Sequence, residues 1–188
     1  MSQPDFDWAT LRETLVHDCG VFELSKYERA NSRKKGEFYV LSGNDWVNII
    51  PVTPNREIVM IEQFRHGTED ITLEIPGGLV DDSDPDPRTA AIREMMEETG
   101  YTSDDVEHLG TIAPNPAIQS NRCHSFLANG AALTQRPETD ELEEIRTRLV
   151  PAEEIPDLIR TGKITHALVV VAFAYYALRS AAEGFSFH

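Results

Sequence analysis

The stretch that decides the fold is GGLVDDSDPDPRTAAIREMMEETGY, residues Gly77 to Tyr101. Asp86 followed by proline is typical of a helix start, in which Asp86 caps the first turn and Pro87 occupies the first helical position. Gly100 suits the left-handed residue that commonly ends a helix. The sequence therefore predicts a helix from Pro87 to Thr99.

Three glutamates gather near the end of this predicted helix. Glu94, Glu97 and Glu98 have the i, i+3 and i, i+4 spacing that makes side chains neighbours, and each like-charge pair costs about 0.2–0.5 kcal/mol. The helix dipole also disfavours negative charge at this end. Arg93 can neutralise only one of the three. We expect the glutamates to lie opposite the apolar side of the helix, which is formed by Ala91, Ile92, Met95, Met96 and Thr99.

A hard divalent cation among the glutamates would offset this repulsion. Mg²⁺ and Mn²⁺ prefer oxygen ligands and usually keep several waters, which a substrate phosphate can replace. The pair Gly77-Gly78 in front of the helix favours this interpretation, because residues without a Cβ let the backbone approach a metal or phosphate closely. A solvated helix face is the alternative.

The rest of the chain alternates short apolar runs with turn-forming pieces. From Phe38 to Glu74 the runs FYVL, WVNIIPVT, EIVMIEQF and ITLEI are typical of successive strands. Further strands are predicted in VEHLGTIA, RCHSFLANGA and IRTRLV, and helices at Ala152–Arg160 and Thr165–Arg179. A short helix is expected around Trp8–Leu15. Strands interleaved with helices predict a mixed α/β sandwich.

Composition excludes some classes of protein. The chain of 188 residues has a net charge of -15 and a pI near 4.7, which argues against a nucleic-acid partner because the field would repel a polyanion. The start of the sequence has no secretory signal, and the longest apolar run, Ala167–Leu178, is shorter than the ~20 residues that span a bilayer. Two cysteines, Cys19 and Cys123, indicate a reducing compartment. We therefore expect a cytoplasmic protein with no membrane partner.

Residues Gly78 to Tyr101 resemble the signature of the Nudix hydrolases, G-x5-E-x7-R-E-U-x-E-E-x-G-U, in which U is aliphatic or bulky. The second half, REMMEETGY, fits position by position. The first half departs from the pattern, because fourteen residues rather than thirteen separate Gly78 from Arg93 and the early glutamate is absent. An inserted residue, with Asp84 or Asp86 in place of that glutamate, is the simplest explanation.

The resemblance covers most of the chain and is to the branch that hydrolyses ADP-ribose and nucleoside diphosphate sugars. The segments EQFRHG, LEIPGG, NPAIQSNRCHSFLA and DELEEI carry it. It implies a Nudix α/β/α sandwich with a mixed β-sheet over residues 38–188, preceded by an antiparallel β region in an N-terminal extension, residues 1–37. Members of this branch commonly form homodimers through their N-terminal strands, and the resemblance implies a homodimer here.

The resemblance also implies roles around the glutamate cluster. Glu94 and Glu98 would ligate Mg²⁺ or Mn²⁺ directly, and the carbonyl of Gly77 would be a further metal ligand. Glu97 would act through water or support the other ligands. Arg93 would orient these carboxylates through ion pairs.

A substrate pocket is implied as well, lined by Arg65 and Glu74. Three aromatic residues, Trp46, Phe38 and Tyr39, are candidates for a face that stacks on a nucleobase. Their positions in apolar runs favour the alternative, which is that they belong to the strand core.

Hydrolysis also needs a general base, which in this branch often comes from an acidic loop after the signature. The matching loop is Asp140–Glu144. Glu141 is the expected base and Glu143 an additional metal ligand. Glu138 and Glu144 are the alternatives.

The reaction that the resemblance implies is metal-dependent hydrolysis of the diphosphate of ADP-ribose or another nucleoside diphosphate sugar, giving a nucleoside monophosphate and a sugar phosphate. Catalysis would consist chiefly of positioning and electrostatics. One alternative is a Nudix hydrolase of another nucleoside diphosphate derivative, such as a dinucleotide or a coenzyme A derivative. Another is a non-catalytic, nucleotide-sensing Nudix module. The retained carboxylates of REMMEE favour an enzyme.

Overall fold

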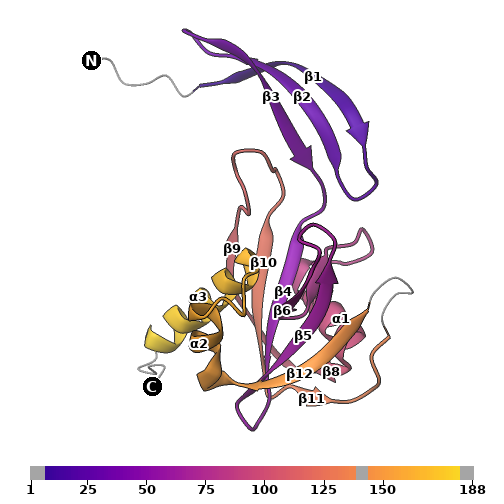
Figure 1. Ribbon diagram of the computed structural model, residues 1–188. Helices are drawn as coiled ribbons and strands as arrows, with labels where there is room; N and C mark the ends of the chain where they lie inside the picture. The colour runs from indigo at the N-terminus through magenta and orange to yellow at the C-terminus, as the bar shows by residue number, and fades with distance from the viewer. Residues whose placement is uncertain (1–6, 139–143, 183–188) are drawn as a thin grey trace. The chain divides into compact units, whose positions relative to one another are not determined.

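The structure is a computed structural model that describes residues 7–138 and 144–182 (Figure 1). The chain divides into two compact units. The first comprises residues 7–44 and Ala113–Arg122, and the second comprises Asp45–Ile112 and residues 123–182. A boundary between residues 37 and 38, which the sequence suggested, would fall inside a strand of the first unit.

The first unit contains a three-stranded antiparallel sheet in the order β1-β2-β3. Its strands are β1 (Ala9–Asp18), β2 (Glu23–Ala30) and β3 (Lys35–Ser42). The antiparallel N-terminal β region is therefore confirmed, whereas the short helix expected around Trp8–Leu15 is wrong. That segment is a strand because it pairs with the whole of β2, and such tertiary pairing overrides weak local propensity.

The second unit is built on a seven-stranded mixed sheet with the core order β12-β5-β4-β10-β9, to which β6 is added beside β5 and β7 beside β4. β4 and β10 run parallel, and the other pairs are antiparallel. The strands are β4 (Trp46–Val52), β5 (Glu57–Arg65), β6 (Asp70–Glu74), β7 (Gly77–Leu79), β9 (Asp105–Ile112), β10 (Cys123–Asn129) and β12 (Ile145–Pro151). Two short strands, β8 (Tyr101–Thr102) and β11 (Ala132–Leu133), pair separately.

Helices cover both faces of this mixed sheet (Figure 1). α1 (Pro87–Thr99) covers one face, and the other carries α2 (Ile155–Arg160), which follows the short 3-10 helix η1 (Ala152–Glu154), and α3 (Ala167–Ala182). The expected α/β/α sandwich with a mixed sheet is confirmed. Among residues 7–138 and 144–182, no helix combines the length and apolarity needed to cross a membrane.

β4 separates the two hydrophobic cores of this unit. Its side chains alternate between the faces of the sheet, as in any strand. Val47 and Ile49 pack in the core under α1, whereas Ile50 packs in the core under α3. β4 therefore presents residues to both layers, and Trp46 and Asn48, near its start, lie on the same side as Ile50.

Candidate functional site

α1 begins and ends where the sequence predicts. The carboxylate of Asp86 accepts a hydrogen bond from the Thr89 N–H at 2.8 Å, which caps the first turn. Gly100 has φ 74° and donates its N–H to the Met96 carbonyl at 2.8 Å, which closes the last turn. Asp86 is therefore the N-cap residue of α1.

Arg93 on α1 lies among four carboxylates. Its Nη2 is 3.0 Å from an oxygen of Asp84 and 3.4 Å from one of Asp81, and its Nη1 is 3.0 Å from both Glu94 and Glu97. The hydrogen bond with Asp84 is the main cause that raises the pKa of Arg93 and lowers the pKa of Asp84. Four negative charges around one guanidinium leave this cluster with surplus negative charge.

Asp84 is thus the aspartate that contacts the signature arginine, a choice that the sequence left open between Asp84 and Asp86. Its side chain is 5% exposed and binds Arg93 through both carboxylate oxygens, at 3.0 and 3.3 Å. The ion pairs expected of Arg93 are present with Glu94 and Glu97. The loop before α1 therefore supplies a carboxylate although it departs from the signature.

Glu98 lies deeper than the sequence suggests. The sequence places it with Glu94 and Glu97, but Glu98 is only 4% exposed, so it is covered by neighbouring elements and is not on a solvated face. The reason is that β7 packs against α1 and the Gly77 N–H donates a 2.9 Å hydrogen bond to Glu98 Oε2. This bond ties the glycine turn directly to the carboxylate cluster.

The two glycines of β7 allow close packing on either side. A Cβ on Gly77 would overlap the carbonyl oxygen of Val47 and lie 2.9 Å from the Cα of Asn48, both backbone atoms of β4. A Cβ on Gly78 would overlap the carboxylate of Glu94, at 2.6 Å from its Cδ. β7 can therefore lie against β4 and against the glutamates of α1 only because it has no side chains at these positions.

The oxygen donors gathered here fit a hard divalent cation in their chemistry. The carboxylate of Glu98 binds the Gly77 N–H and that of Glu94 lies beside Gly78, so both carboxylates lie against the glycine pair, and oxygen ligands suit Mg²⁺ or Mn²⁺. Within residues 7–138 and 144–182, no group of three or more acidic, histidine or cysteine side chains is arranged to hold a metal ion. The expected further ligand Glu143 and the expected base Glu141 lie outside the described residues.

Glu138 and Glu144, the two alternatives for the general base, lie on either side of residues 139–143, which the structure does not describe. The backbone N–H of Glu138 donates to the carbonyl of Glu97 at 2.8 Å, so the chain at residue 138 lies beside the last turns of α1. Glu144 is exposed and directly precedes β12. Of these two, Glu138 is the residue whose backbone contacts the glutamate cluster.

Arg65 and Glu74 form a bidentate ion pair at the ends of β5 and β6. Nε and Nη2 of Arg65 each lie 2.8 Å from an oxygen of Glu74, and the Thr72 hydroxyl donates a third hydrogen bond to this carboxylate. The Glu74 side chain is 3% exposed and that of Arg65 is 37% exposed. Burial alone would raise the pKa of Glu74, but the bonds from Arg65 and Thr72 outweigh it and hold this pKa below its usual value.

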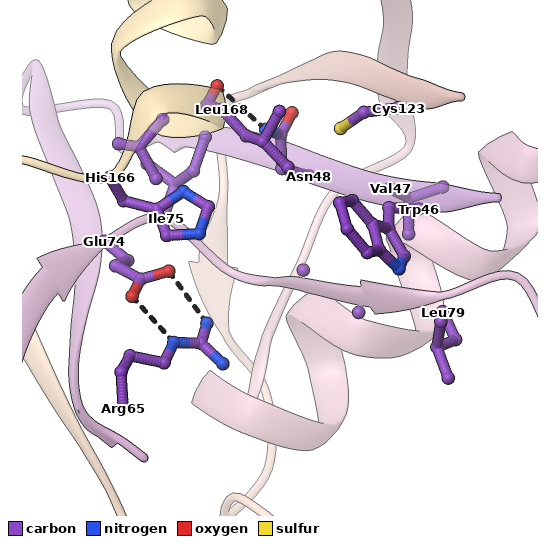
Figure 2. Close-up of a pocket in the computed structure, with 13 residues that line it drawn as sticks. Trp46, Val47, Asn48, Arg65, Glu74, Ile75, Leu79, Cys123, His166 and Leu168 are labelled. Carbon is purple, nitrogen blue, oxygen red and sulfur yellow. Dashed lines mark hydrogen bonds and ion pairs between the residues drawn. The ribbon is translucent and has the colours of Figure 1, made fainter. Parts of the chain in front are cut away.

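A cavity of about 350 Å³ brings this ion pair together with the glycine turn (Figure 2). Its walls include Arg65, Glu74, Gly77 and Gly78, so the two parts of the predicted site share one space. Because Gly77 also binds Glu98, the cavity adjoins the carboxylates of α1. The remaining polar and aromatic lining residues are Trp46, Asn48, Cys123 and His166.

Sequence reasoning missed part of this cavity. The signal for Asn48 is a single polar residue inside the apolar run WVNIIPV, whereas nothing in the sequence marks His166. Trp46 lines the cavity and is partly exposed, and Phe38 and Tyr39 are 40% and 54% exposed on β3 in the other unit. The interpretation of these three aromatic residues as strand core is therefore wrong.

The ion pair of Glu74 makes stability depend on pH. We expect Glu74→Gln to lower the free energy of unfolding at pH 7 by about 1.5–3 kcal/mol, the range for hydrogen bonds to charged groups. The folded pKa of Glu74 is lowered, so its contribution is fully present above the unfolded value near 4.3 and is lost as pH falls through the folded pKa. Urea unfolding at pH 7, 5, 4 and 3 measures this. A difference between the two proteins that stays constant down to pH 3 would contradict it.

Comparison with known proteins gives a consistent result. Residues 45–171 match the model of a family described as the NUDIX domain. A CMP-5'-(N-acetyl-N-hydroxy-3-aminopropyl)phosphonate hydrolase of Streptomyces rubellomurinus is 36% identical over 178 residues, which cover 94% of this chain and 85% of that protein. The ADP-ribose pyrophosphatase of Bacillus subtilis is 30% identical over 138 residues, covering 73% of this chain and 74% of that protein.

A solved structure shares the fold. The crystal structure of an ADP compounds hydrolase matches with a TM-score of 0.86, covering 97% of this chain and 99% of that chain. The sequence identity is 21%. At this identity the match supports the architecture alone.

Proposed function

The chain belongs to the Nudix hydrolases, and we propose that it hydrolyses the diphosphate linkage of ADP-ribose or another nucleoside diphosphate sugar in a metal-dependent reaction. The products would be a nucleoside monophosphate and a sugar phosphate. One observation carries the proposal: Gly77 lines the cavity that contains the Arg65–Glu74 pair and also donates its N–H to Glu98. A substrate in this cavity would therefore have its diphosphate beside the carboxylates of α1.

The relatives support a nucleotide substrate of this general kind. By their names, the Bacillus subtilis protein acts on ADP-ribose and the Streptomyces protein on a CMP-linked phosphonate. Both names describe a nucleotide joined to a second group. Hydrolysis of another nucleotide derivative, including a CMP-linked compound, is therefore the second candidate function.

The charge of the site argues for a cation partner. A diphosphate is itself anionic, and the surplus negative charge around Arg93 would repel it. A bound divalent cation such as Mg²⁺ or Mn²⁺ would neutralise the diphosphate and lower the pKa of an attacking water. Glu94, Glu98 and the Gly77 carbonyl would hold it.

The remaining residues of the cluster would position these ligands. Arg93 holds Glu94 and Glu97 through its Nη1, and Asp84 holds the opposite side of the guanidinium. Partners of this kind restrict the orientation of metal ligands. Glu97 would support the direct ligands through the same guanidinium or through water.

Arg65 would interact with the substrate phosphates from the cavity wall. Its guanidinium is fixed in one plane by the bidentate contact with Glu74, and it remains partly exposed. A planar, permanently charged group suits phosphate binding. Glu74 would thus act as the residue that positions Arg65.

The general base is proposed in the acidic loop. Glu141 is the first candidate, Glu143 would add a metal ligand, and Glu138 and Glu144 are the substitutes. The contact between the Glu138 N–H and the Glu97 carbonyl supports a loop that starts beside the cluster.

We also propose a homodimer formed through the N-terminal sheet. β1 is an edge strand that is exposed along its whole length, and its exposed side chains include Leu11, Leu15 and Val16. An unpaired edge with apolar side chains favours association with a second copy. Light scattering should give twice the chain mass, and Leu15→Glu should lower it toward the monomer. A wild-type monomer at all concentrations would contradict the proposal.

The experiment that tests the function is product release from a substrate panel. ADP-ribose, GDP-mannose, UDP-glucose, a CMP-linked compound and a dinucleotide are each incubated after chelation and again with added Mg²⁺ or Mn²⁺. We expect at least one nucleoside diphosphate sugar to be cleaved, with activity lost after chelation and restored by metal. No turnover of any compound, with ADP-ribose still raising the melting temperature, would support the sensor alternative instead.

A further inference from the structure

Two buried polar atoms in the cavity wall lack hydrogen-bond partners. Among the residues that the structure describes, the buried side-chain atoms without a partner are Arg29 Nε, Asn48 Oδ1, Gln63 Oε1 and His166 Nδ1. Asn48 and His166 both line the cavity, as Figure 2 shows, whereas Gln63 is not among its lining residues. A buried polar group left unpaired costs about 1–3 kcal/mol, so two such atoms on residues that line one cavity require an explanation.

The chemistry of the unpaired atom on Asn48 is fixed by its neighbour. The Nδ2 of Asn48 donates a 3.2 Å hydrogen bond to the carbonyl of Leu168 at the start of α3. Only the amide nitrogen can make that bond, so the atom without a partner is the oxygen, which accepts and cannot donate. The residue is 6% exposed, so bulk water does not readily satisfy this oxygen. Oδ1 therefore needs an N–H or O–H group, which an ordered water can supply, as can a ligand that displaces that water.

The surroundings favour an uncharged part of that ligand. Trp46 and Asn48 lie two residues apart on the same side of β4, about 6.6 Å along the strand. The lining also includes the apolar residues Ile75, Leu168 and Val169. Its charged residues, Arg65 and Glu74, are paired with each other, and Glu74 also interacts with His166. An acceptor oxygen among apolar side chains repels phosphate oxygens, which are acceptors themselves, but suits a base or sugar that carries a donor.

We propose that Asn48 Oδ1 accepts a hydrogen bond from an N–H or O–H group in the uncharged part of the nucleotide substrate, so that Asn48 and His166 form a specificity-determining subsite. The identity of the ligand as a nucleotide rests on the proposed function. The donor is an exocyclic amino group of the base or a hydroxyl group of a ribose. His166 Nδ1 pairs with a second polar atom of the same group, as donor or acceptor according to its tautomer.

This subsite makes a testable distinction between ligands. A substrate analogue without the donor leaves Oδ1 buried and unpaired in the complex, so it binds less tightly than the natural ligand. An analogue that lacks a donor elsewhere binds with little change. The weaker binding of that analogue is caused by Asn48 Oδ1, so it should disappear in a variant in which residue 48 has no acceptor atom.

The test measures kcat/KM for each ligand with saturating Mg²⁺ and dissociation constants by calorimetry in EDTA, so that discrimination can be read with and without a bound cation. The ligands are ADP-ribose, its inosine counterpart, which lacks the base amino group, and analogues that are 2-deoxy at either ribose. For wild type we expect one analogue to bind about tenfold or more weakly than ADP-ribose, a difference of about 1.4 kcal/mol. The analogue that shows the loss identifies base or sugar as the source of the donor.

Three variants carry the comparison, each first checked for a cooperative thermal unfolding transition. In Asn48→Leu the dissociation constants of ADP-ribose and of the discriminated analogue should differ by less than about twofold. Asn48→Ala also removes the acceptor but adds no bulk, and should reduce the loss in the same way, which keeps the proposal testable if the leucine variant does not fold. Gln63→Leu removes another buried, unpaired amide oxygen outside the cavity and should behave as wild type.

The outcomes separate this proposal from the proposed function. Equal discrimination by wild type and Asn48→Leu for every analogue, with ADP-ribose still bound or hydrolysed, would overturn the subsite alone. If ADP-ribose is neither bound nor hydrolysed, both proposals fail. A loss that Gln63→Leu also abolishes would mean that the effect is not specific to Asn48.

Discussion

Glu98→Gln should lower the kcat of diphosphate hydrolysis by about 10³-fold and leave the fold intact. The substitution preserves an oxygen that can accept the 2.9 Å hydrogen bond from the Gly77 N–H, so the glycine turn is retained. It removes the negative charge of a buried carboxylate that we assign to a metal ion. Metal ions contribute several kcal/mol to transition-state stabilisation, and each 1.36 kcal/mol is a factor of ten in rate.

Glu97→Gln is the matched control for this prediction. Glu97 belongs to the same cluster, but its side chain is 39% exposed and contacts Arg93, and we assign it a supporting role. Its loss should cost about 10–100-fold, as for other groups that position metal ligands. Steady-state rates over a range of Mg²⁺ concentrations, with thermal unfolding of both variants, measure the difference. If Glu98→Gln stays within tenfold of wild type, or Glu97→Gln is the more damaging of the two, the assignment of the ligands is incorrect.

Local chemistry explains which elements the sequence predicts well. The bounds of α1 follow from Asp86-Pro87 at one end and Gly100 at the other, and the structure confirms both ends. The strands of the mixed sheet other than β7 follow from short apolar runs between turn residues, whereas β7 contains the glycine pair and no such run. The first strand could not be predicted in this way, because every residue of β1 is exposed and its conformation depends on pairing with β2, which lies outside any local window.

The same distinction between local and tertiary causes applies to the candidate site. The glutamates of α1 form a motif within one helix, so the sequence identifies the cluster and its surplus charge. The burial of Glu98 and the choice of Asp84 as the partner of Arg93 depend on how β7 and the preceding loop pack on the helix. Asn48 and His166 are far apart in the sequence, and only the folded second unit brings them into one cavity.

The neighbouring glycines of β7 should respond to alanine in opposite ways. Gly77→Ala should lower the free energy of unfolding by about 3 kcal/mol, because the new methyl group would overlap backbone atoms of β4 that cannot move aside separately from the strand. A loss of this size corresponds to a fall of about 6–12 °C in melting temperature for a chain of this length. Neither glycine is among the described residues with positive φ, so the effect is steric rather than conformational.

Gly78→Ala should instead lose activity with little loss of stability. Its methyl group would meet the end of the Glu94 side chain, which can rotate away at a cost below about 1 kcal/mol. Rotation moves the carboxylate from its position beside Arg93, and a displacement of about 1 Å in a catalytic group can cost 10²-fold in rate. Melting temperatures and kcat for both variants test the contrast. A Gly78→Ala protein that is as destabilised as Gly77→Ala, or fully active, would contradict the view that β7 holds the backbone sheet on one side and the catalytic carboxylate on the other.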